Sequence, residues 1–326
     1  MVLVGDIGGT HARLSLRGSG GRHVRTEVFE SRRYPSLEAV VQAFLGRMHP
    51  KPKVDAAAFG VAGPVVKGRC VATNLPWVID SRVLARSLSI RKVVLLNDLV
   101  ALALGAVGVR KGKLHPLSGG GTPKRRGANV AVLAAGTGLG EAVLVWDGTG
   151  FVPNATEGGH ADFAPRDDVE VDLLHFLRER FGHVSWERVL SGAGLGNVYD
   201  FFVRAKGLAE PAHNARTIAD AVDRNAAIAE LGISRKSEAA ARAVRLFASV
   251  YGAEAGNLAL KTLAVGGVYI CGNIAARMVG VLDEGGFRRA FVDKGRFGPF
   301  MEAIPVAVVL DSDVGLAGAA RVAFSG

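Results

Sequence analysis

The feature that most constrains the fold is a strand–turn–strand segment at the start of the chain, GDIGGTHARL at residues 5–14. The apolar run 2–4 predicts a short buried strand. The alternation of apolar and polar residues over 12–17 predicts a second strand with one buried face. Only residues 8–10 separate the two strands, so the connection is a tight turn. Glycines there admit positive φ and let a ligand approach backbone N–H groups. Successive N–H groups in such a turn form a concave anion site.

A second segment repeats this architecture. An apolar strand over 128–133 leads into AAGTGLGEA at 134–142, and a strand-like run follows at 143–146. A nucleotide polyphosphate held by two domains needs one anion site from each, so the pair favours nucleotide binding. Asp6 ends the first strand beside its turn, which fits a divalent cation between the acid and a phosphate. A plain hairpin with Asp6 as a turn residue is the alternative.

Length and composition predict two domains of α/β type. A chain of 326 residues is too long for one small core. Hydrophobic residues make up 49% of it, as packed α/β layers require. The stretch 107–127 is glycine-rich, basic and unpatterned, and we expect a domain boundary near its start.

Several classes of protein are excluded or disfavoured by the sequence. No basic segment with a following apolar stretch marks a signal peptide, and no apolar run has the length of a membrane span. Cys70 and Cys271 are the only cysteines, which excludes a disulfide framework or a cysteine-rich zinc site. We therefore expect a cytoplasmic protein without a membrane partner. The net charge of +10 could mark a nucleic-acid surface, but Lys and Arg are scattered apart from the cluster 124–126. A solvated basic surface that suits anionic substrates is the preferred interpretation, with no nucleic-acid partner.

Two polar residues follow a buried strand near the middle of the first half. Residues 92–96 predict the strand and 99–104 a helix, with Asn97 and Asp98 at their junction. Ligands of open α/β sheets bind at the carboxyl ends of strands. Asp98 is also a good helix N-cap, and a cap role is compatible with a role in binding.

Polar loops in the second half carry further candidates. Glu157 and His160 share the loop TEGGHADFAP and could be metal ligands, partners of a polyhydroxyl ligand, or a surface pair. Glu187 precedes a helix predicted to end at Gly207, where a first-turn acid also suits the helix dipole. The segment GGVYICGNIAAR at 266–277 predicts a strand, a glycine turn and a helix start. This geometry can place backbone against an adenine ring, although it resembles any strand–helix junction.

Two other segments predict packing rather than chemistry. The turn-rich stretch 72–80 displays Asn74 and Trp77, and Trp77 is expected to be a core residue rather than a ligand wall. The segment 313–323 predicts a helix whose alanines and glycines allow close packing against another helix.

In this order, the motifs resemble those of the bacterial glucokinases of the hexokinase/actin-like superfamily over nearly the whole chain. GDIGGTHARL and AAGTGLGEA are similar to the two phosphate motifs, and GGVYICGNIAAR is similar to the adenosine motif. LLNDLVALA resembles the segment with the catalytic acid, while EGGHADFAP and VSWERVLSG resemble the sugar loops. The resemblance implies two ribonuclease H-like domains flanking a cleft. The small domain would comprise 1–108 plus 309–326, and the large domain 109–308.

The resemblance also implies an activity. It is the transfer of the γ-phosphoryl group of ATP to the 6-hydroxyl of glucose, with Mg²⁺, by a homodimer formed through the large domain. It assigns the general base to Asp98 and the sugar contacts to Asn74, Asn97, Asp98, Glu157, His160 and Glu187. It assigns the nucleotide contacts to Gly5, Asp6, Ile7, Gly8, Gly9, Thr10, Gly136, Thr137, Gly138, Gly272 and Asn273, with Asp6 reaching the metal through water.

The sequence departs from the family pattern at two places. Glu141 stands where a small apolar residue is common, and Asn273, Ala275 and Ala276 replace what is often Gly-x-Pro. A kinase for another hexose, a kinase with another phosphoryl donor, and a non-catalytic sugar sensor on the same fold remain open alternatives. Retention of Asp98 and both glycine turns argues against the sensor.

Overall fold

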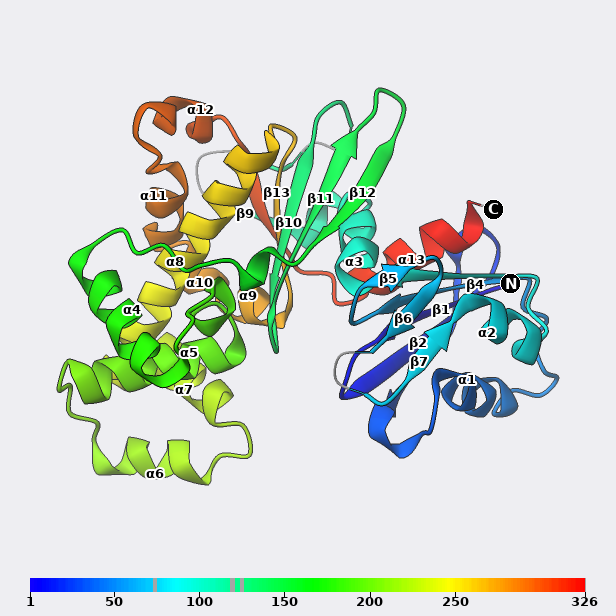
Figure 1. The fold of residues 1–326 in the computed structure, drawn as a ribbon, viewed down its shortest axis with the longest axis horizontal. Helices are drawn as coiled ribbons and strands as arrows, with labels where there is room; N and C mark the ends of the chain where they lie inside the picture. The colour runs from blue at the N-terminus through cyan, green and yellow to red at the C-terminus, as the bar shows by residue number, and fades with distance from the viewer. Residues whose placement is uncertain (73–74, 118–120, 124–125, 326) are drawn as a thin grey trace. The chain divides into compact units, whose positions relative to one another are not determined.

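The computed structural model describes residues 1–72, 75–117, 121–123 and 126–325. Asn74, Lys124 and Arg125, which the sequence singled out, lie outside these residues. The chain forms two compact units, the first with residues 1–110, 153–155 and 311–326 and the second with residues 111–152 and 156–310. Both combine mixed sheets with helices, as expected for an α/β fold (Figure 1).

The first unit is built on a five-stranded sheet of order β3-β2-β1-β4-β8. Strands β1, β4 and β8 are parallel to one another, whereas β1–β2 and β2–β3 are antiparallel. A small antiparallel sheet of order β5-β6-β7 accompanies it. The strands are β1 (Val2–Ile7), β2 (His11–Arg17), β3 (His23–Glu30), β4 (Ala56–Val61), β5 (Val65–Val66), β6 (Arg69–Val71), β7 (Val78–Asp80) and β8 (Lys92–Asn97). The helices are α1 (Leu37–Gly46), α2 (Ser81–Leu88), α3 (Asp98–Ala106) and α13 (Val314–Phe324), with 3₁₀ turns η1 (Ser19–Gly21) and η2 (Ser31–Arg33).

The strand predictions for the start of the chain are confirmed, because the alternating residues of β2 bury one face in the core. Ala12, Leu14 and Leu16 are buried there. Ser36 caps α1, its Oγ accepting from the backbone N–H of Ala39 at 3.4 Å. Trp77 is a core residue, and its indole N–H donates to the carbonyl of Tyr34 at 3.2 Å.

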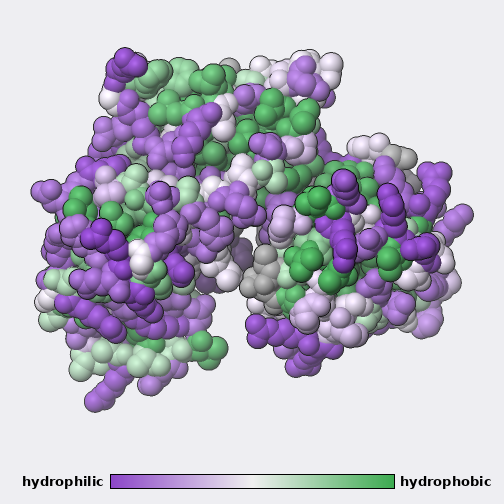
Figure 2. Space-filling view, viewed as in Figure 1, coloured by the Kyte–Doolittle hydropathy of each residue, from purple (hydrophilic) through white to green (hydrophobic). Residues whose placement is uncertain are grey.

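The small sheet β5–β7 has one buried and one exposed face. Cys70 and Ile79 point into the core, whereas Val66, Val71 and Val78 are exposed. Figure 2 shows hydrophobic side chains among hydrophilic ones over this part of the unit.

The C-terminal helix completes the first unit. Helix α13 packs against α3, β1 and β4, and its red ribbon lies beside them in Figure 1. The approach to α3 is so close that a Cβ at Gly318 would lie 1.7 Å from the carbonyl oxygen of Ala101. The small residues of this helix therefore serve close helix packing, as the sequence predicted.

The second unit holds a six-stranded sheet of order β12-β11-β10-β13-β14-β9. Strands β10, β13 and β14 are parallel, and β11 and β9 are antiparallel to their neighbours. The long helix α8 packs against β10 and β13 and carries α7 and α11 on its other sides. The strands are β9 (Leu114–Pro116), β10 (Val130–Ala135), β11 (Leu139–Trp146), β12 (Phe151–Thr156), β13 (Gly267–Cys271) and β14 (Val306–Val309).

The helices of the second unit are α4 (Asp168–Phe181), α5 (Gly192–Asp200), α6 (Ala212–Asp220), α7 (Arg224–Ile233), α8 (Glu238–Thr262), α9 (Asn273–Arg277), α10 (Val279–Leu282), α11 (Gly286–Val292) and α12 (Gly298–Glu302). Short turns are η3 (Lys111–Lys113), η4 (Gly158–His160), η5 (Trp186–Arg188) and η7 (Gly295–Phe297), and a π-helical segment η6 (Phe201–Ala205) follows α5. Among the described residues, no helix combines the length and the apolar character needed to cross a membrane.

Candidate active site

The first glycine turn, Gly8–Thr10, connects β1 to β2 and offers backbone donors. The N–H of Gly8 is used inside the turn, since it donates to the carbonyl of His11 at 2.9 Å. Within the described residues, the N–H groups of Gly9 and Thr10 have no acceptor. Two successive unpaired N–H groups fit an anion such as a phosphate.

Ser31 holds this turn in place, a role that the sequence did not reveal. Its hydroxyl donates to the carbonyl of Gly8 at 2.9 Å, and its backbone N–H donates to the carbonyl of Thr10 at 2.9 Å. Ser31 is itself buried, so the clamp is shielded from water.

Asp6 lies on β1 next to this turn, opposite Arg13 of β2. The protein packed around it raises the pKa of its carboxyl group, and the nearby Arg13 guanidinium opposes that rise. The residue is nonetheless open to solvent, which a group that contacts a hydrated cation requires. Arg13 also pairs with Asp313 and donates to the carbonyl of Ser312 at 2.8 Å, so its charge is shared.

Asn97 and Asp98 lie at the same sheet edge as the first glycine turn. In the parallel ladders, Ile7 is level with Val61, and Val61 is level with Asn97, so the three strands end together. The sequence expectation that Asp98 caps the following helix is wrong. Asn97 is the cap, and its Oδ1 accepts from the N–H groups of Leu99 at 2.9 Å and Val100 at 3.3 Å.

Asn97 rather than Asp98 is the cap because of the backbone conformation: Asn97 is extended, whereas Asp98 is already helical. The Nδ2 group of Asn97 donates to the carbonyl of Gly63 at 3.3 Å, which leaves its second amide hydrogen for a ligand. Asp98 is half-buried, and its Oδ1 accepts from the N–H of Leu99 at 2.8 Å.

A buried cysteine is an unexpected neighbour of Asp98. Burial, and next the charge of Asp98, raise the pKa of the Cys70 thiol. The Cys70 thiol therefore stays protonated and is a packing group near Asp98 rather than a nucleophile.

The second glycine turn, Gly136–Gly138, connects β10 to β11 in the second unit. The N–H of Gly136 donates to the carbonyl of Gly138 at 2.8 Å, and the carbonyl of Gly136 accepts from the N–H of Gly192 at 2.8 Å. Within the described part of the chain, the N–H groups of Thr137 and Gly138 have no acceptor. The turn thus repeats the donor pattern of the first one.

The segment at Gly272 lies beside this second turn. Strands β10 and β13 are parallel, with Ala134 level with Cys271, so both strands end at one edge. Gly272 has φ +94°, and a Cβ there would lie 2.6 Å from the carbonyl oxygen of Ala135. Only glycine fits this backbone, which brings Asn273 close to the turn as an adenosine-binding segment requires.

Three predicted sugar residues gather near the start of β11. Glu157 precedes η4 and His160 is its last residue. Both are exposed, and the N–H of His160 donates to the carbonyl of Glu157 at 3.0 Å. Glu187 lies on η5, and its Oε2 accepts from the N–H of Leu139 at 3.0 Å. A bond from the N–H of Trp186 to the carbonyl of Ala161 at 3.0 Å joins the two loops.

The second unit therefore brings Glu157, His160, Glu187 and the second glycine turn together. Glu187 links η5 to the second glycine turn, since its carboxylate accepts from the N–H of Leu139, the first residue after that turn. The first unit brings Asp6, Asn97, Asp98 and the first glycine turn together at one sheet edge.

The donors present fit a magnesium ion carried mainly by water and phosphate. Among the described residues, no group of three His, Cys, Asp or Glu side chains could hold a metal. Mg²⁺ keeps several waters and commonly binds through one or two carboxylates plus substrate phosphates. Asp6, next to the first glycine turn, meets that requirement.

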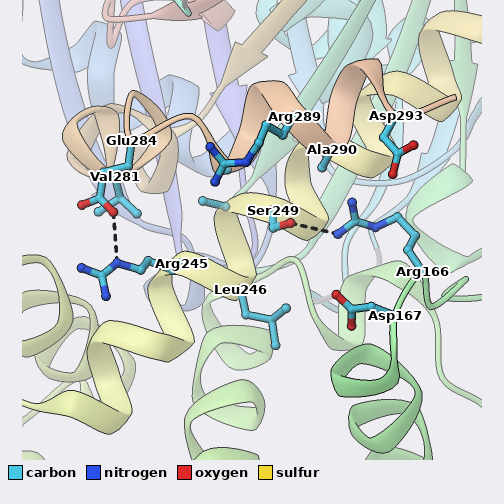
Figure 3. A pocket seen from close by; sticks show the side chains of 12 residues that line it. Arg166, Asp167, Arg245, Leu246, Ser249, Val281, Glu284, Arg289, Ala290 and Asp293 are labelled. Carbon is cyan, nitrogen blue, oxygen red and sulfur yellow. Dashed lines mark hydrogen bonds and ion pairs between the residues drawn. The ribbon is translucent and has the colours of Figure 1, made fainter. Parts of the chain in front are cut away.

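The second unit also has a cavity of about 620 Å³ that contains none of the predicted site residues. Figure 3 shows its side chains, with Ser249 bonded to Arg166 and Glu284 to Arg245. Its three arginines, including Arg289, are matched by Asp167, Glu284 and Asp293, so its charge selects no particular ligand.

Two glycine turns with unpaired N–H groups, an acid at a strand end and clustered polar side chains are the features of an α/β phosphotransferase. Comparison with known proteins defines the family. The sequence model of the glucokinase family matches residues 3–325. The glucokinase of Nostoc punctiforme is 38% identical over 98% of both chains. The chain belongs to the glucokinase family.

Solved structures agree with this assignment. A glucokinase from an Antarctic psychrotroph has a TM-score of 0.84 and 29% identity, covering 100% of this chain and 99% of its own. A ROK family glucokinase from Streptomyces griseus, solved with glucose and AMPPNP, has a TM-score of 0.67 over 100% of this chain and 99% of its own. Its 22% identity supports the fold alone.

Proposed function

We propose that the chain phosphorylates D-glucose at the 6-hydroxyl with ATP, giving glucose 6-phosphate as the first step of glycolysis. The observation that carries this proposal is the family match over residues 3–325, combined with a half-buried acid, Asp98, at the carboxyl end of β8. The two glycine turns supply backbone donors for the phosphates of the nucleotide.

In the proposed mechanism the protein positions groups and stabilises charge, as phosphoryl transfer requires. Asp98 accepts the proton of the sugar 6-hydroxyl as the bond to phosphorus forms. Asn97, Glu157, His160 and Glu187 bind the other hydroxyl groups and so fix the orientation of the sugar. Asp6 would hold Mg²⁺ through water, and the bound ion would neutralise phosphate charge.

Nucleotide binding is proposed for both units. Gly5, Ile7 and the first glycine turn are proposed to contact the phosphates, as is the second glycine turn. Gly272 and Asn273 are proposed to contact the adenosine. A Cβ at Gly5 would lie 2.6 Å from the ring of Phe59, so a larger residue would displace β1 and its turn.

The proposal extends to organisation and setting. The chain is proposed to form two ribonuclease H-like domains that flank a cleft, a small one of residues 1–108 plus 309–326 and a large one of residues 109–308. The enzyme is proposed to act as a cytoplasmic homodimer through its large domain. Light scattering on the purified protein tests the dimer, because a monomer at micromolar concentration contradicts it.

An assay that couples ADP release to a spectroscopic signal tests the activity. Glucose-dependent ADP release that requires MgATP supports the proposal. Binding of glucose without any ADP release would instead identify a sugar sensor.

A further inference from the structure

Two carboxyl groups are buried together in the second unit, and the mechanism uses neither. Glu141 of β11 has 2% of its surface exposed, and Glu254 of α8 has 1%. Within the described residues, Oε1 of Glu141 has no hydrogen-bond partner. An ionised carboxylate without partners is very unfavourable in such a place, so this group keeps a proton or obtains compensation from a neighbour.

The two acids differ in the hydrogen bonds and positive charges that stabilise their ionised forms. Glu254 accepts a hydrogen bond from Asn257 at 2.9 Å, lies 3.8 Å from the Nζ atom of Lys261, and feels the charge of Lys294. For Glu141, the charge of Lys261 lowers the pKa, whereas the hydrogen bond with Glu254 raises it. Burial, and next the charge of Glu254, raise the pKa of Glu141 to about 8.

Apart from Lys261, the described elements around Glu141 add no charge that would lower its pKa. From α8, Tyr251 faces the pair, but its hydroxyl stays protonated and accepts from the N–H of Ala135 at 3.1 Å. Within the described residues, β10, β12 and η4 contribute no charged group that acts on Glu141 or Glu254. Burial is also the largest cause that raises the pKa of Glu254, whereas the hydrogen bond with Glu141 lowers it, which fits a proton held by Glu141 between the two carboxyl groups.

The proposed sugar-binding loop 156–160 packs on the side chain of Glu141. A Cβ at Gly158 would lie 2.1 Å from Oε2 of Glu141, so the loop backbone packs directly on the carboxyl group. The hydroxyl of Thr156 donates to the carbonyl of Glu141 at 3.2 Å and accepts from the N–H of Gly158 at 3.2 Å. The proposed sugar ligands Glu157 and His160 flank this contact.

We propose that Glu141 is a positioning residue of the sugar site: in its neutral form, hydrogen-bonded to Glu254, it supports the loop 156–160, and loss of the proton loosens that loop. This inference rests on the proposed function, since it assigns the loop to sugar binding. Ionisation would place two buried carboxylates together, and water must then reach them. Strand β10 and helix α8 are held by core packing, so the exposed loop is the element that yields.

The size of the effect follows from the titration. Between pH 7 and pH 9 the neutral fraction of a group with a pKa of about 8 falls about tenfold, and the apparent affinity of a site that needs the neutral form falls equally. The glucose KM of the wild type is therefore expected to rise about tenfold over this range, while the KM for ATP stays nearly constant.

Variants and a matched control test this assignment. Glu141→Gln is neutral at every pH and can donate its amide N–H to Glu254, so its glucose KM is expected to lose the alkaline rise. Glu254→Gln removes the repelling charge, so the rise should begin at lower pH. Glu238→Gln, an exposed acid at the start of the same helix α8, should keep the wild-type profile.

A measurement without substrates separates this inference from the proposed function. Hydrogen–deuterium exchange of the peptide around 156–160, corrected for the intrinsic effect of pH, should increase above about pH 8 in the wild type and not in Glu141→Gln. An unchanged wild-type profile, or an alkaline rise of KM and exchange that persists in Glu141→Gln, overturns the inference. Absence of glucose phosphorylation at every pH, with the exchange change intact, overturns the proposed function alone.

Discussion

Asp98→Asn separates the proposed catalytic role of Asp98 from its place at the start of α3. The cap of this helix is Asn97, whose Oδ1 accepts from Leu99 at 2.9 Å and from Val100 at 3.3 Å, so the substitution leaves the cap intact. An asparagine at position 98 also keeps an oxygen that can accept from Leu99. The substitution removes a negative charge near the helix N-terminus, which is worth about 0.3–1 kcal/mol. The free energy of unfolding is expected to change by no more than that.

The effect on the rate is expected to be much larger. An asparagine cannot accept the proton of the sugar hydroxyl, and a positioned base contributes about 10²–10⁴-fold, so kcat should fall at least about a hundredfold. The assay is steady-state ADP release, paired with denaturant unfolding of the same preparations. Asn97→Ala is the control, because it removes the cap and should cost about 0.5–2 kcal/mol of stability. A kcat near that of the wild type for Asp98→Asn would refute the base, and a large loss of stability would refute the assignment of the cap.

Three further outcomes are expected. Glu157→Ala should weaken glucose use by about 1.5–3 kcal/mol, as for a hydrogen bond to a charged group, with an unchanged KM for ATP; equal changes for both substrates would count against a sugar role. Gly318→Ala should destabilise the first unit by about 1–3 kcal/mol, because its Cβ would lie 1.7 Å from the carbonyl of Ala101, and a wild-type unfolding curve would contradict this packing. Glu141→Gln should become more stable than the wild type as pH rises from 4.5 to about 8, by at most about 1.4 kcal/mol per pH unit, because the wild-type group ionises first in the unfolded chain; a pH-independent difference would rule this out.

The sequence predicted features that depend on residues close together in the chain. The first glycine turn and its strands follow from glycine chemistry and a period of two, both readable in β1 and β2. Apolar positions at helical spacing over 235–263 indicate a long helix, and α8 is observed at Glu238–Thr262. The close packing of α13 follows from its small residues.

Features set by competition between similar neighbours were not predictable. Asn97 and Asp98 are both good caps, and only the fold decides which one is extended. The same ambiguity applies to α4, where Asp167 and Asp168 are adjacent and Asp167 is the cap. The helix after η5, expected to reach Gly207, ends at Asp200 and continues as the π-helical η6.

Contacts between segments that are distant in the sequence were also not predictable. The bond from Ser31 to Gly8 and the pairing of Glu141 with Glu254 join residues on different elements, and no local pattern indicates them. Glu141 was visible only as an acid in an apolar strand, and the structure supplies its partner. The sequence could therefore name the sugar loop but not the carboxyl group that supports it.

The substrate specificity of the purified enzyme most directly tests the proposed phosphorylation of glucose by ATP. ADP release, or the loss of donor, would be measured with glucose, mannose, fructose and N-acetylglucosamine as acceptors, and with ATP and polyphosphate as donors. We expect the highest kcat/KM for glucose with MgATP and no turnover once Mg²⁺ is chelated. A higher kcat/KM for another sugar or for polyphosphate, or no phosphorylation of glucose at all, would contradict the proposal.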